Sequence, residues 1–372
     1  MKIIFSANSS RYLYNFRRNS IAALMKESHD IYCISPYDQF SEKLTSLGVN
    51  YIPMQLSRAS INPFKEIQCI LSIIKIFKKI GPDLVINFTV KCNLYGAIAS
   101  IFLRKKPMVI NNITGLGSFF IKRNIASFLI NLLYGMIKKR VYLTYFQNQY
   151  DLSYFLQNKL VDEGMYELLP GSGVDCNHFI PSGKSSKNKT FRFIFVGRLI
   201  KDKGIMELIE SSKRLANEFN FELIILGIID KENPTSLSDQ ELFKISNYSF
   251  IKIFFDVMDI REHLSTADCF VLPSYREGLP RSALEAMSSG LPIILSDAPG
   301  CKDLVSNNIN GLACNVRSVN SLYLAQKEML SKDKQVLSIM GKNGRRLVLE
   351  KYSETIVIKS LLDRIANIKF LK

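Results

Sequence analysis

The sequence has no hydrophobic run long enough to cross a membrane. The longest candidate, IASFLINLLYGMI at residues 125–137, is shorter than the roughly 18 residues that such a helix needs, and KKR follows it directly. The first residues, MKIIFSANSS, are too short for a secretion signal and are typical of a buried strand. We therefore expect a soluble protein that stays in the cytoplasm.

Cysteine pairs and histidine clusters are also missing. The seven cysteines are odd in number, scattered along the chain and never spaced as C-x-x-C. This pattern argues against both a disulfide framework and a zinc site. The three histidines, His29, His178 and His263, form no pattern typical of catalysis or metal binding. The sequence therefore predicts no bound metal.

The composition and length indicate a two-domain globular protein with an uneven positive charge. The 372 residues are 47% hydrophobic and 22% charged, and they exceed the size of one typical core. The net charge is +16, and residues 1–170 contribute +11 from 21 Lys and Arg against 10 Asp and Glu. A basic half favours an anionic partner, either phosphate groups, nucleic acid or an anionic membrane. A lysine-rich surface without any partner is the alternative.

Buried strands alternating with helical segments form two series along the chain. The strand-like runs are KIIFSA, DIYCIS, PDLVINF, PMVINNI, VYLTYFQN and MYELLP, then FRFIFVG, FELIILG, FIKIFF, CFVLPS and PIILSD. Continuous hydrophobic strands of this kind are typical of parallel sheets covered on both faces. We expect two doubly wound α/β domains over residues 1–170 and 191–352, with a linker over 171–190. A last helix over 353–372 is expected to pack back on the first domain.

The loop GRLIKDKG follows the first strand of the second series. Ligands of such sheets bind beyond the carboxyl ends of the strands. Arg198 and Lys203 stand there between Gly197 and Gly204, which allow tight turns. Two cations at this spacing could straddle a diphosphate. The alternative is a pair of ordinary surface cations at the start of a helix.

The segment REGLPRSALEA follows the strand FVLP and reaches the same edge of the sheet. Gly278, Pro280 and Ser282 are typical of a loop that opens a helix, whose N-terminal N–H groups attract anions. Glu277 and Glu285 have seven residues between them, and carboxylates accept hydrogen bonds from vicinal hydroxyls. Together the two loops suit a nucleotide sugar, with ribose, two phosphates and hexose in a row. Singly, Glu277 could be a solvated charge and Glu285 a partner of the helix dipole.

These residues carry a resemblance to a known family. GRLIKDKG and EGLPRSALEAMSSGLPIILSDAPG resemble the donor-phosphate loop and the E-x7-E signature of retaining glycosyltransferases of the GT-B fold. The segments LSRASINPF, NFTVKCNLYG, NNITGLGSFF and GSGVDCNHF resemble a bacterial subgroup. That subgroup adds sugars to undecaprenyl-diphosphate-linked saccharides in O-antigen, capsule or N-glycan assembly. The resemblance implies two Rossmann-like domains facing an interdomain cleft, with the acceptor on the first and the nucleotide sugar on the second.

The resemblance also implies roles on the donor side. Arg198 and Lys203 would bind the diphosphate and stabilise the departing nucleotide, and with Glu277 they form the expected catalytic set. Glu277 would bind the transferred sugar, and Glu285 the ribose. The full donor-binding set is Gly197, Arg198, Lys203, Glu277, Gly278, Leu279, Pro280, Arg281 and Glu285.

On the acceptor side, the resemblance implies Lys91 and Asn93 of TVKCN, and Thr114 and Gly115 of ITGLG. The loop after the first strand departs from the family, which often has a glycine-rich loop there. This chain has SANSSRY, in which small hydroxyl side chains could still donate hydrogen bonds. The predicted acceptor-binding set is Ser9, Ser10, Lys91, Asn93, Thr114 and Gly115.

The chain has no D-x-D to hold a metal ion on a diphosphate and no obvious carboxylate nucleophile. We therefore expect a metal-independent reaction in which cationic side chains neutralise the leaving group. The leaving phosphate would help to deprotonate the acceptor on the same face of the sugar. The subgroup favours a hexose or N-acetylhexosamine, in particular N-acetylgalactosamine carried on UDP. A nucleotide-sugar epimerase is the alternative, although no acid/base set for it is identifiable.

Two segments combine apolar and basic residues in a way that favours binding to a membrane surface. FKEIQCILSIIKIFKKI (64–80) and IKRNIASFLINLLYGMIKKR (121–140) combine apolar stripes with lysine and arginine at their ends. Such helices can lie in the membrane interface, although core helices with solvated ends would look similar. We expect a nucleotide sugar, a lipid-linked saccharide and the anionic inner leaflet as partners, at the inner membrane. No recognisable module favours nucleic acid.

Overall fold

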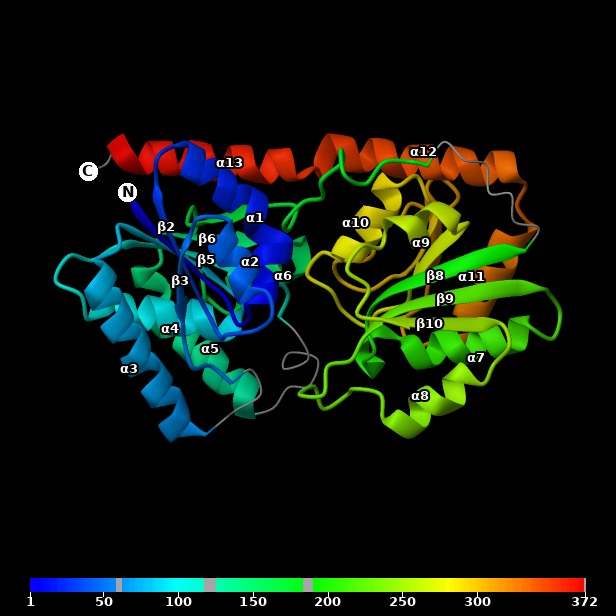
Figure 1. Cartoon of the computed structure of the whole chain (residues 1–372), viewed down its shortest axis with the longest axis horizontal. Coiled ribbons are helices and arrows are strands. Elements are labelled where there is room, and N and C mark those ends of the chain that lie inside the picture. Colours follow the sequence, from blue (N-terminus) through cyan, green and yellow to red (C-terminus); the bar gives the residue numbers. More distant parts are fainter. Residues whose placement is uncertain (58–61, 117–124, 183–189, 371–372) are drawn as a thin grey trace. The chain divides into compact units, whose positions relative to one another are not determined.

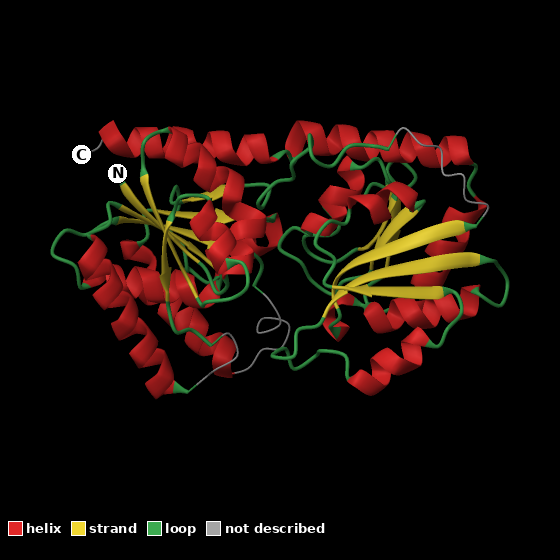
Figure 2. Ribbon diagram, viewed as in Figure 1, coloured by secondary structure: helices red, strands yellow, loops and turns green. Residues whose placement is uncertain are grey.

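The computed structural model describes residues 1–57, 62–116, 125–182 and 190–370 (Figure 1). Its chain divides into two compact units. The first unit comprises residues 1–172 and 356–372, and the second comprises 173–355. Each unit is an α/β sandwich built on one sheet (Figure 2).

The sheet of the first unit has seven parallel strands in the order β3-β2-β1-β4-β5-β6-β7. Its central strands are continuous apolar runs, and every residue of LVINF in β4 is buried. Helices cover both faces of the sheet, so both sides of each strand are buried and apolar residues do not alternate with polar ones. The strands are β1 (Lys2–Ser6), β2 (Asp30–Ser35), β3 (Asn50–Pro53), β4 (Leu84–Phe88), β5 (Met108–Ile113), β6 (Leu143–Phe146) and β7 (Tyr166–Leu168).

The helices of the first unit form two layers, one on each face of this sheet (Figure 1). One layer holds α3 (Pro63–Ile80), α4 (Val90–Ile101), α5 (Ile125–Ile137) and α6 (Gln149–Gln157), with the short 3-10 helix η2 (Lys138–Arg140) after α5. The other layer holds α1 (Ser10–Lys26), α2 (Ser41–Ser46) and α13 (Glu354–Phe370). Each layer shares one continuous apolar core with the sheet.

The sheet of the second unit has six parallel strands in the order β10-β9-β8-β11-β12-β13. Its strands are β8 (Phe191–Arg198), β9 (Phe221–Ile228), β10 (Ile251–Phe255), β11 (Cys269–Leu272), β12 (Ile293–Ser296) and β13 (Gly311–Cys314). Its helices are η3 (Lys201–Lys203), α7 (Ile205–Leu215), α8 (Asp239–Ser246), α9 (Arg261–Thr266), α10 (Arg281–Ser288), α11 (Val319–Ser331) and α12 (Lys334–Lys351). The strand order reverses between β8 and β11, which is where open α/β sheets bind ligands.

The expected linker over 171–190 is only partly a linker. Residues 173–182 belong to the second unit, because Val174, Cys176 and Phe179 are buried in its core. The Ser288 hydroxyl also donates a 2.6 Å hydrogen bond to the Phe179 carbonyl. Residues 183–189 lie outside the described part of the chain.

The last helix returns to the first unit. Leu361, Ile365 and Ile368 of α13 are buried in the same apolar cluster as Ile3 and Phe5 of β1. The helix therefore completes one face of the first sheet, although the whole second unit precedes it in the chain. Across the described residues, no helix is both long and apolar enough to span a bilayer.

Candidate active site

Arg198 is the last residue of β8, and its side chain is held by the neighbouring loop. The guanidinium Nη1 donates a 2.7 Å hydrogen bond to the Oδ2 atom of Asp230, which is only 7% exposed. Asp230 follows β9, and the parallel pairing of Arg198 with Ile228 brings both chain ends to one edge of the sheet. The sequence analysis placed Arg198 at this edge but did not identify its acidic partner.

Gly204 allows the loop after β8 to approach the loop after β11. It adopts a left-handed backbone with φ +69°, and a Cβ atom there would overlap the carbonyl oxygen of Pro273. Glycine is the residue that accepts both the positive φ and the close contact without strain. The preceding 3-10 turn, η3, ends at Lys203, so the close approach brings this lysine to the residues that follow β11.

Lys203 and Glu277 form an ion pair between Nζ and Oε1. Both side chains are largely buried, at 17% and 12% exposure, so solvent screens the pair less than it would at the surface. The backbone of Glu277 is fixed as well, because its N–H donates a 3.0 Å hydrogen bond to the Pro299 carbonyl. At Gly300, with φ +80°, a Cβ atom would lie 2.5 Å from the carbonyl oxygens of Glu277 and Gly278. The structure thus brings together two of the three predicted catalytic residues.

Helix α10 begins at Arg281, immediately after the turn that contains Gly278. Pro280 is the N-cap of this helix. Its carbonyl accepts the first helical hydrogen bond, 3.1 Å from the Ala283 N–H. Leu279 is partly buried against the core of the second unit and anchors the turn. The helix N-terminus therefore lies at the carboxyl edge, as predicted.

Glu285 lies one turn into α10 and pairs with Arg281. The Arg281 Nε atom donates a 2.9 Å hydrogen bond to Glu285 Oε1, and both side chains are mostly buried. Burial raises the pKa of the Glu285 carboxyl, and the neighbouring guanidinium partly offsets this effect. A desolvated carboxylate of this kind gains from a hydroxyl donor, which is the partner that a ribose would supply.

Tyr275 contacts the turn that carries Lys203, and it was not among the residues predicted from the sequence. Its N–H donates a 2.9 Å hydrogen bond to the Asp202 carbonyl, and its hydroxyl donates a 2.6 Å bond to Glu207 Oε1 on α7. The Arg317 guanidinium lies over the ring at 4.5 Å from the centroid. Burial and the Glu207 carboxylate raise the pKa of the Tyr275 hydroxyl. These contacts link residues far apart in sequence, so no local pattern could have revealed them.

On the predicted acceptor side, Ser10 and Asn93 are committed to internal hydrogen bonds. Ser10 is 0% exposed and its hydroxyl bonds those of Ser35 and Ser41 at 2.7 and 2.8 Å. Asn93, also 0% exposed, donates a 2.9 Å bond to the Asn112 carbonyl. A side chain without exposed surface cannot touch an acceptor, so the predicted contacts of these two residues are corrected to structural roles. Ser9 is the N-cap of α1.

Lys91, Thr114 and Gly115 lie at the carboxyl edge of the first sheet. Lys91, in the first turn of α4, forms a 2.8 Å ion pair with Glu66 and donates a 2.8 Å bond to the Ser57 carbonyl. Thr114 and Gly115 directly follow β5 and are half-buried. Thr89, which precedes α4, has φ +71° and ψ 155°, a conformation that costs a β-branched residue energy. Residues 117–120 of the NNITGLGSFF segment lie outside the described residues.

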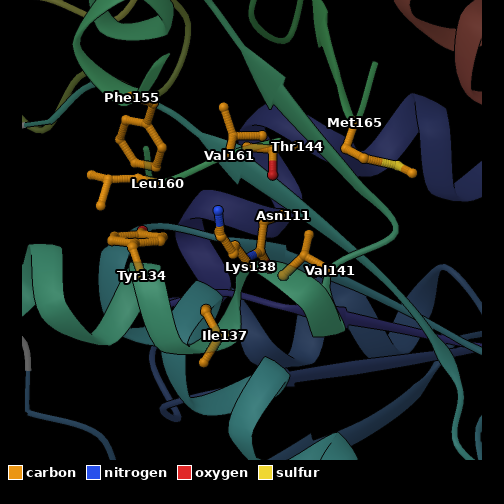
Figure 3. Close-up of a pocket in the computed structure, with 10 residues that line it drawn as sticks. All are labelled: Asn111, Tyr134, Ile137, Lys138, Val141, Thr144, Phe155, Leu160, Val161 and Met165. Atoms are coloured by element: carbon orange, nitrogen blue, oxygen red, sulfur yellow. The ribbon is translucent and has the colours of Figure 1, made fainter. Parts of the chain in front are cut away.

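The pocket drawn in Figure 3 is unrelated to these predicted residues. It lies in the first unit, and its wall is mostly apolar, with Tyr134, Phe155, Leu160 and Val161 around Asn111 and Thr144 (Figure 3). Val141 and Met165, which also line it, precede β6 and β7. The pocket therefore lies toward the amino ends of these strands, opposite the edge that binds ligands in open α/β sheets.

Two doubly wound sheets, with cations and carboxylates gathered at the switch point of the second, are typical of glycosyltransferases of the GT-B class. Two family models match the chain, "Glycosyl transferase 4-like" over residues 2–148 and "Glycosyl transferases group 1" over residues 179–347. The chain belongs to this family of glycosyltransferases, as the sequence analysis predicted.

Relatives and solved structures agree with this assignment. The chain is 30% identical to N,N'-diacetylbacillosaminyl-diphospho-undecaprenol alpha-1,3-N-acetylgalactosaminyltransferase of Campylobacter jejuni, over 98% of this chain and 99% of that protein. It is 26% identical to UDP-Gal:alpha-D-GlcNAc-diphosphoundecaprenol alpha-1,3-galactosyltransferase of Escherichia coli, over 79% and 78% of the two chains. The crystal structure of Anabaena HepE with UDP and glucose has the same fold, with a TM-score of 0.81, 17% identity, and coverage of 99% and 100%.

Proposed function

We propose that the protein is a retaining, metal-independent glycosyltransferase that acts on an undecaprenyl-diphosphate-linked saccharide. UDP-N-acetylgalactosamine is the favoured donor. The similarity to the Campylobacter N-acetylgalactosaminyltransferase extends over nearly the whole of both chains and supports this choice. The relatives named as glycosyltransferases favour transfer over the epimerase alternative.

The Lys203–Glu277 pair is the observation on which the proposal depends most. It places a cation and a hydrogen-bond acceptor together at the carboxyl edge, close to the start of α10. In our proposal the donor diphosphate binds at Lys203 and Arg198, and the pyranose hydroxyls bind at Glu277. The two cations then stabilise the charge that develops on UDP as the glycosidic bond breaks.

Retention follows in this proposal from attack on the face that the nucleotide leaves. The departing phosphate oxygen accepts the proton of the acceptor hydroxyl, so no protein carboxylate has to act as the nucleophile. Glu285 holds the ribose, which fixes the nucleotide while the sugar moves. Among the described residues, we propose that Ser9, Lys91, Thr114 and Gly115 lie along the acceptor.

Incubation with a panel of UDP-sugars and a defined lipid-linked acceptor tests the proposal. We expect transfer of N-acetylgalactosamine and an α-anomeric product from the α-linked donor, identified by mass spectrometry and by the anomeric coupling in NMR. A β-linked product would contradict retention. Release of an epimerised donor without any transfer would instead support the epimerase alternative.

We also propose that the protein works at the inner face of the bacterial membrane, as a peripheral protein. The acceptors named in two relatives are attached to undecaprenol, and residues 1–170 carry a net charge of +11. Charge of this sign favours a surface of anionic lipids.

A further inference from the structure

Arg17 lies on the inner, apolar face of α1. It follows Leu13 by four residues and precedes Ile21 by four, and both of those residues are fully buried. At 3.6 residues per turn this spacing places all three on one side of the helix. The arginine itself is only 4% exposed. Arginine is almost never buried to this extent unless its charge is paired, so its neighbours should contain a counter-charge.

The neighbours of Arg17 provide no negative charge. Its guanidinium lies over the Phe88 ring, 4.4 Å from the centroid, and Nη2 donates a 3.1 Å hydrogen bond to the Tyr12 hydroxyl. The bond from Nη1 to the Gly171 carbonyl is long, at 3.5 Å. The Nε atom has no hydrogen-bond partner, and among the described residues no carboxylate forms an ion pair with Arg17. A ring face and uncharged oxygens compensate a full buried charge only in part.

A small pocket adjoins Arg17 inside the first unit. Its volume is about 10 Å³, which is the size that holds one water-sized species. Besides Arg17, the polar residues in its wall are Ser20, Asn112 and Tyr145, and no acidic residue is among the described residues that line it. Burial raises the pKa of the Tyr145 hydroxyl, so this group stays protonated and can donate a hydrogen bond. The wall therefore carries hydrogen-bond donors and one uncompensated positive charge.

Helix α13 forms one side of this pocket. Val357 and Leu361 of α13 line it together with residues of α1 and of strands β1, β4, β5 and β6. Helices α1 and α13 lie in the same layer (Figure 1) and share one apolar core with the sheet. Arg364, one turn further along α13, pairs with Glu167 of β7, so this carboxylate is engaged by another arginine. Whatever occupies the pocket is therefore enclosed between α13 and the sheet.

We propose that the pocket binds one monovalent anion of the size of chloride, as the counter-ion of Arg17. The Nε–H group donates to the anion, and the hydroxyls of Ser20 and Tyr145 provide further donors from the same wall. A water molecule would satisfy Nε–H but would leave the buried charge without a counter-charge. Because α13 forms one side of the pocket, the anion also stabilises the docking of this helix on the sheet. The inference goes beyond the proposed transfer reaction and needs neither donor nor acceptor.

Exchange of salts at constant ionic strength tests the counter-ion. Chloride should raise the melting temperature of the whole protein by about 4 °C when about 0.3 M potassium gluconate, whose anion is too large for the pocket, is replaced by potassium chloride. Arg17→Met keeps a side chain against Phe88 without the charge, so it should melt at the same temperature in both salts. In gluconate it should be at least as stable as wild type, because the uncompensated charge is gone.

Arg345→Met is the matched control. The Arg345 guanidinium is also partly buried, but the carbonyls of Phe179 and Cys176 accept hydrogen bonds from it at 2.9 and 3.3 Å. This variant should therefore keep the full chloride response. A response that is lost equally in Arg345→Met and Arg17→Met would contradict a site at Arg17.

Two measurements on the wild-type protein locate the anion directly. Crystals soaked in bromide should show an anomalous scattering peak beside Arg17. Amide hydrogens of α13 should exchange about tenfold more slowly when chloride is present at ten times its dissociation constant, whereas those of α12 should not change. Both measurements decide the question even if Arg17→Met does not fold. A pocket that holds only water in bromide, a bromide peak without any salt response, or equal exchange of α13 in both salts would overturn the proposal.

Discussion

Lys203 and Glu277 form a largely buried ion pair although 74 residues separate them in the chain. Two loops at the switch point of the second sheet carry them, and Gly204 permits those loops to touch. Without the glutamate, a lysine in this position would have to lose solvent without an anionic partner. The pair therefore holds the amine in place at this edge of the sheet, and substitutions of either residue test its role.

Lys203→Ala and Arg198→Ala should each lower turnover by about 100- to 1000-fold, because in our proposal both cations stabilise leaving-group charge that develops in the transition state. Lys201→Ala is the matched control. Lys201 lies in the same 3-10 turn, but its amine pairs with Glu241 at 2.9 Å. The turnover of the Lys201→Ala protein should stay within about threefold of wild type, since an exposed ion pair contributes little to stability. Folded Lys203 and Arg198 variants with normal rates would remove these residues from the mechanism.

Glu277→Gln and Glu285→Gln should differ in their effect on UDP binding. Glu277 is assigned to the transferred sugar, so its variant should lose transfer and discriminate less well among donor sugars. Glu285 is assigned to the ribose, so its variant should also bind free UDP more weakly. Isothermal titration with UDP separates the two effects. An unchanged UDP affinity in Glu285→Gln would contradict the ribose assignment.

Gly204→Ala should impair both stability and turnover, because the new Cβ atom would overlap the Pro273 carbonyl and displace Lys203. Gly81→Ala is the matched control, since Gly81 has a similar φ of +61° but open space around it. Gly81→Ala should lower the stability only by the strain of a left-handed backbone, about 1–2 kcal/mol, and turnover should be preserved. Thermal unfolding and initial rates measured well below the melting temperature test both variants. Equal losses of activity would show that the contact with Pro273 is unimportant.

Tyr275→Phe should reduce kcat several-fold while the KM for the donor changes little, because the lost hydroxyl bond to Glu207 anchors the start of α7, which directly follows Lys203 and Gly204. The variant also leaves the Glu207 carboxylate without its tyrosine donor, which costs about 1–3 kcal/mol of stability. Replacing Glu207 by Met in the same protein should restore that stability, since removing both partners is nearly neutral. The rate should stay low. Recovery of kcat together with stability would mean that the tyrosine acts only on folding.

Activity should survive EDTA, because in our proposal Lys203 and Arg198 neutralise the departing diphosphate. The measurement is the initial rate of transfer after dialysis against chelator, compared with the rate after magnesium is added back. A complete loss that magnesium restores would contradict the metal-independent reaction.

The sequence predicted eleven of the thirteen described strands, and the loops at the carboxyl edge of the second sheet, because those signals are local; it missed the four-residue strands β3 and β13. Continuous apolar runs mark strands that are buried on both faces, and the loop after each strand must reach the carboxyl edge. This reasoning places Arg198, Lys203 and Glu277 at one edge of the sheet from the sequence alone. The partners of these residues, such as Asp230 for Arg198, could not be predicted because pairing depends on how separate loops pack.

The prediction was weaker where a side chain could face either inward or outward. Ser10 opens α1 at the sheet edge, but the rotation of that helix turns its hydroxyl toward Ser35 and Ser41. Asn93 likewise points at β5 and not at the edge. The predicted linker was too long at its start, because the Gly-, Ser- and Lys-rich run begins only at residue 181, whereas Val174, Cys176 and Phe179 before it are core residues.

The return of α13 to the first unit has a consequence for synthesis on the ribosome. Residues 1–172 are translated before the second unit, whereas the helix that covers Ile3 and Phe5 is translated after it. The second unit, which ends at residue 355, can therefore complete its core while the first still has one open apolar face. Folding of this chain is thus expected to finish in the opposite order to translation, and nascent chains stalled before residue 356 should expose that face to chaperones.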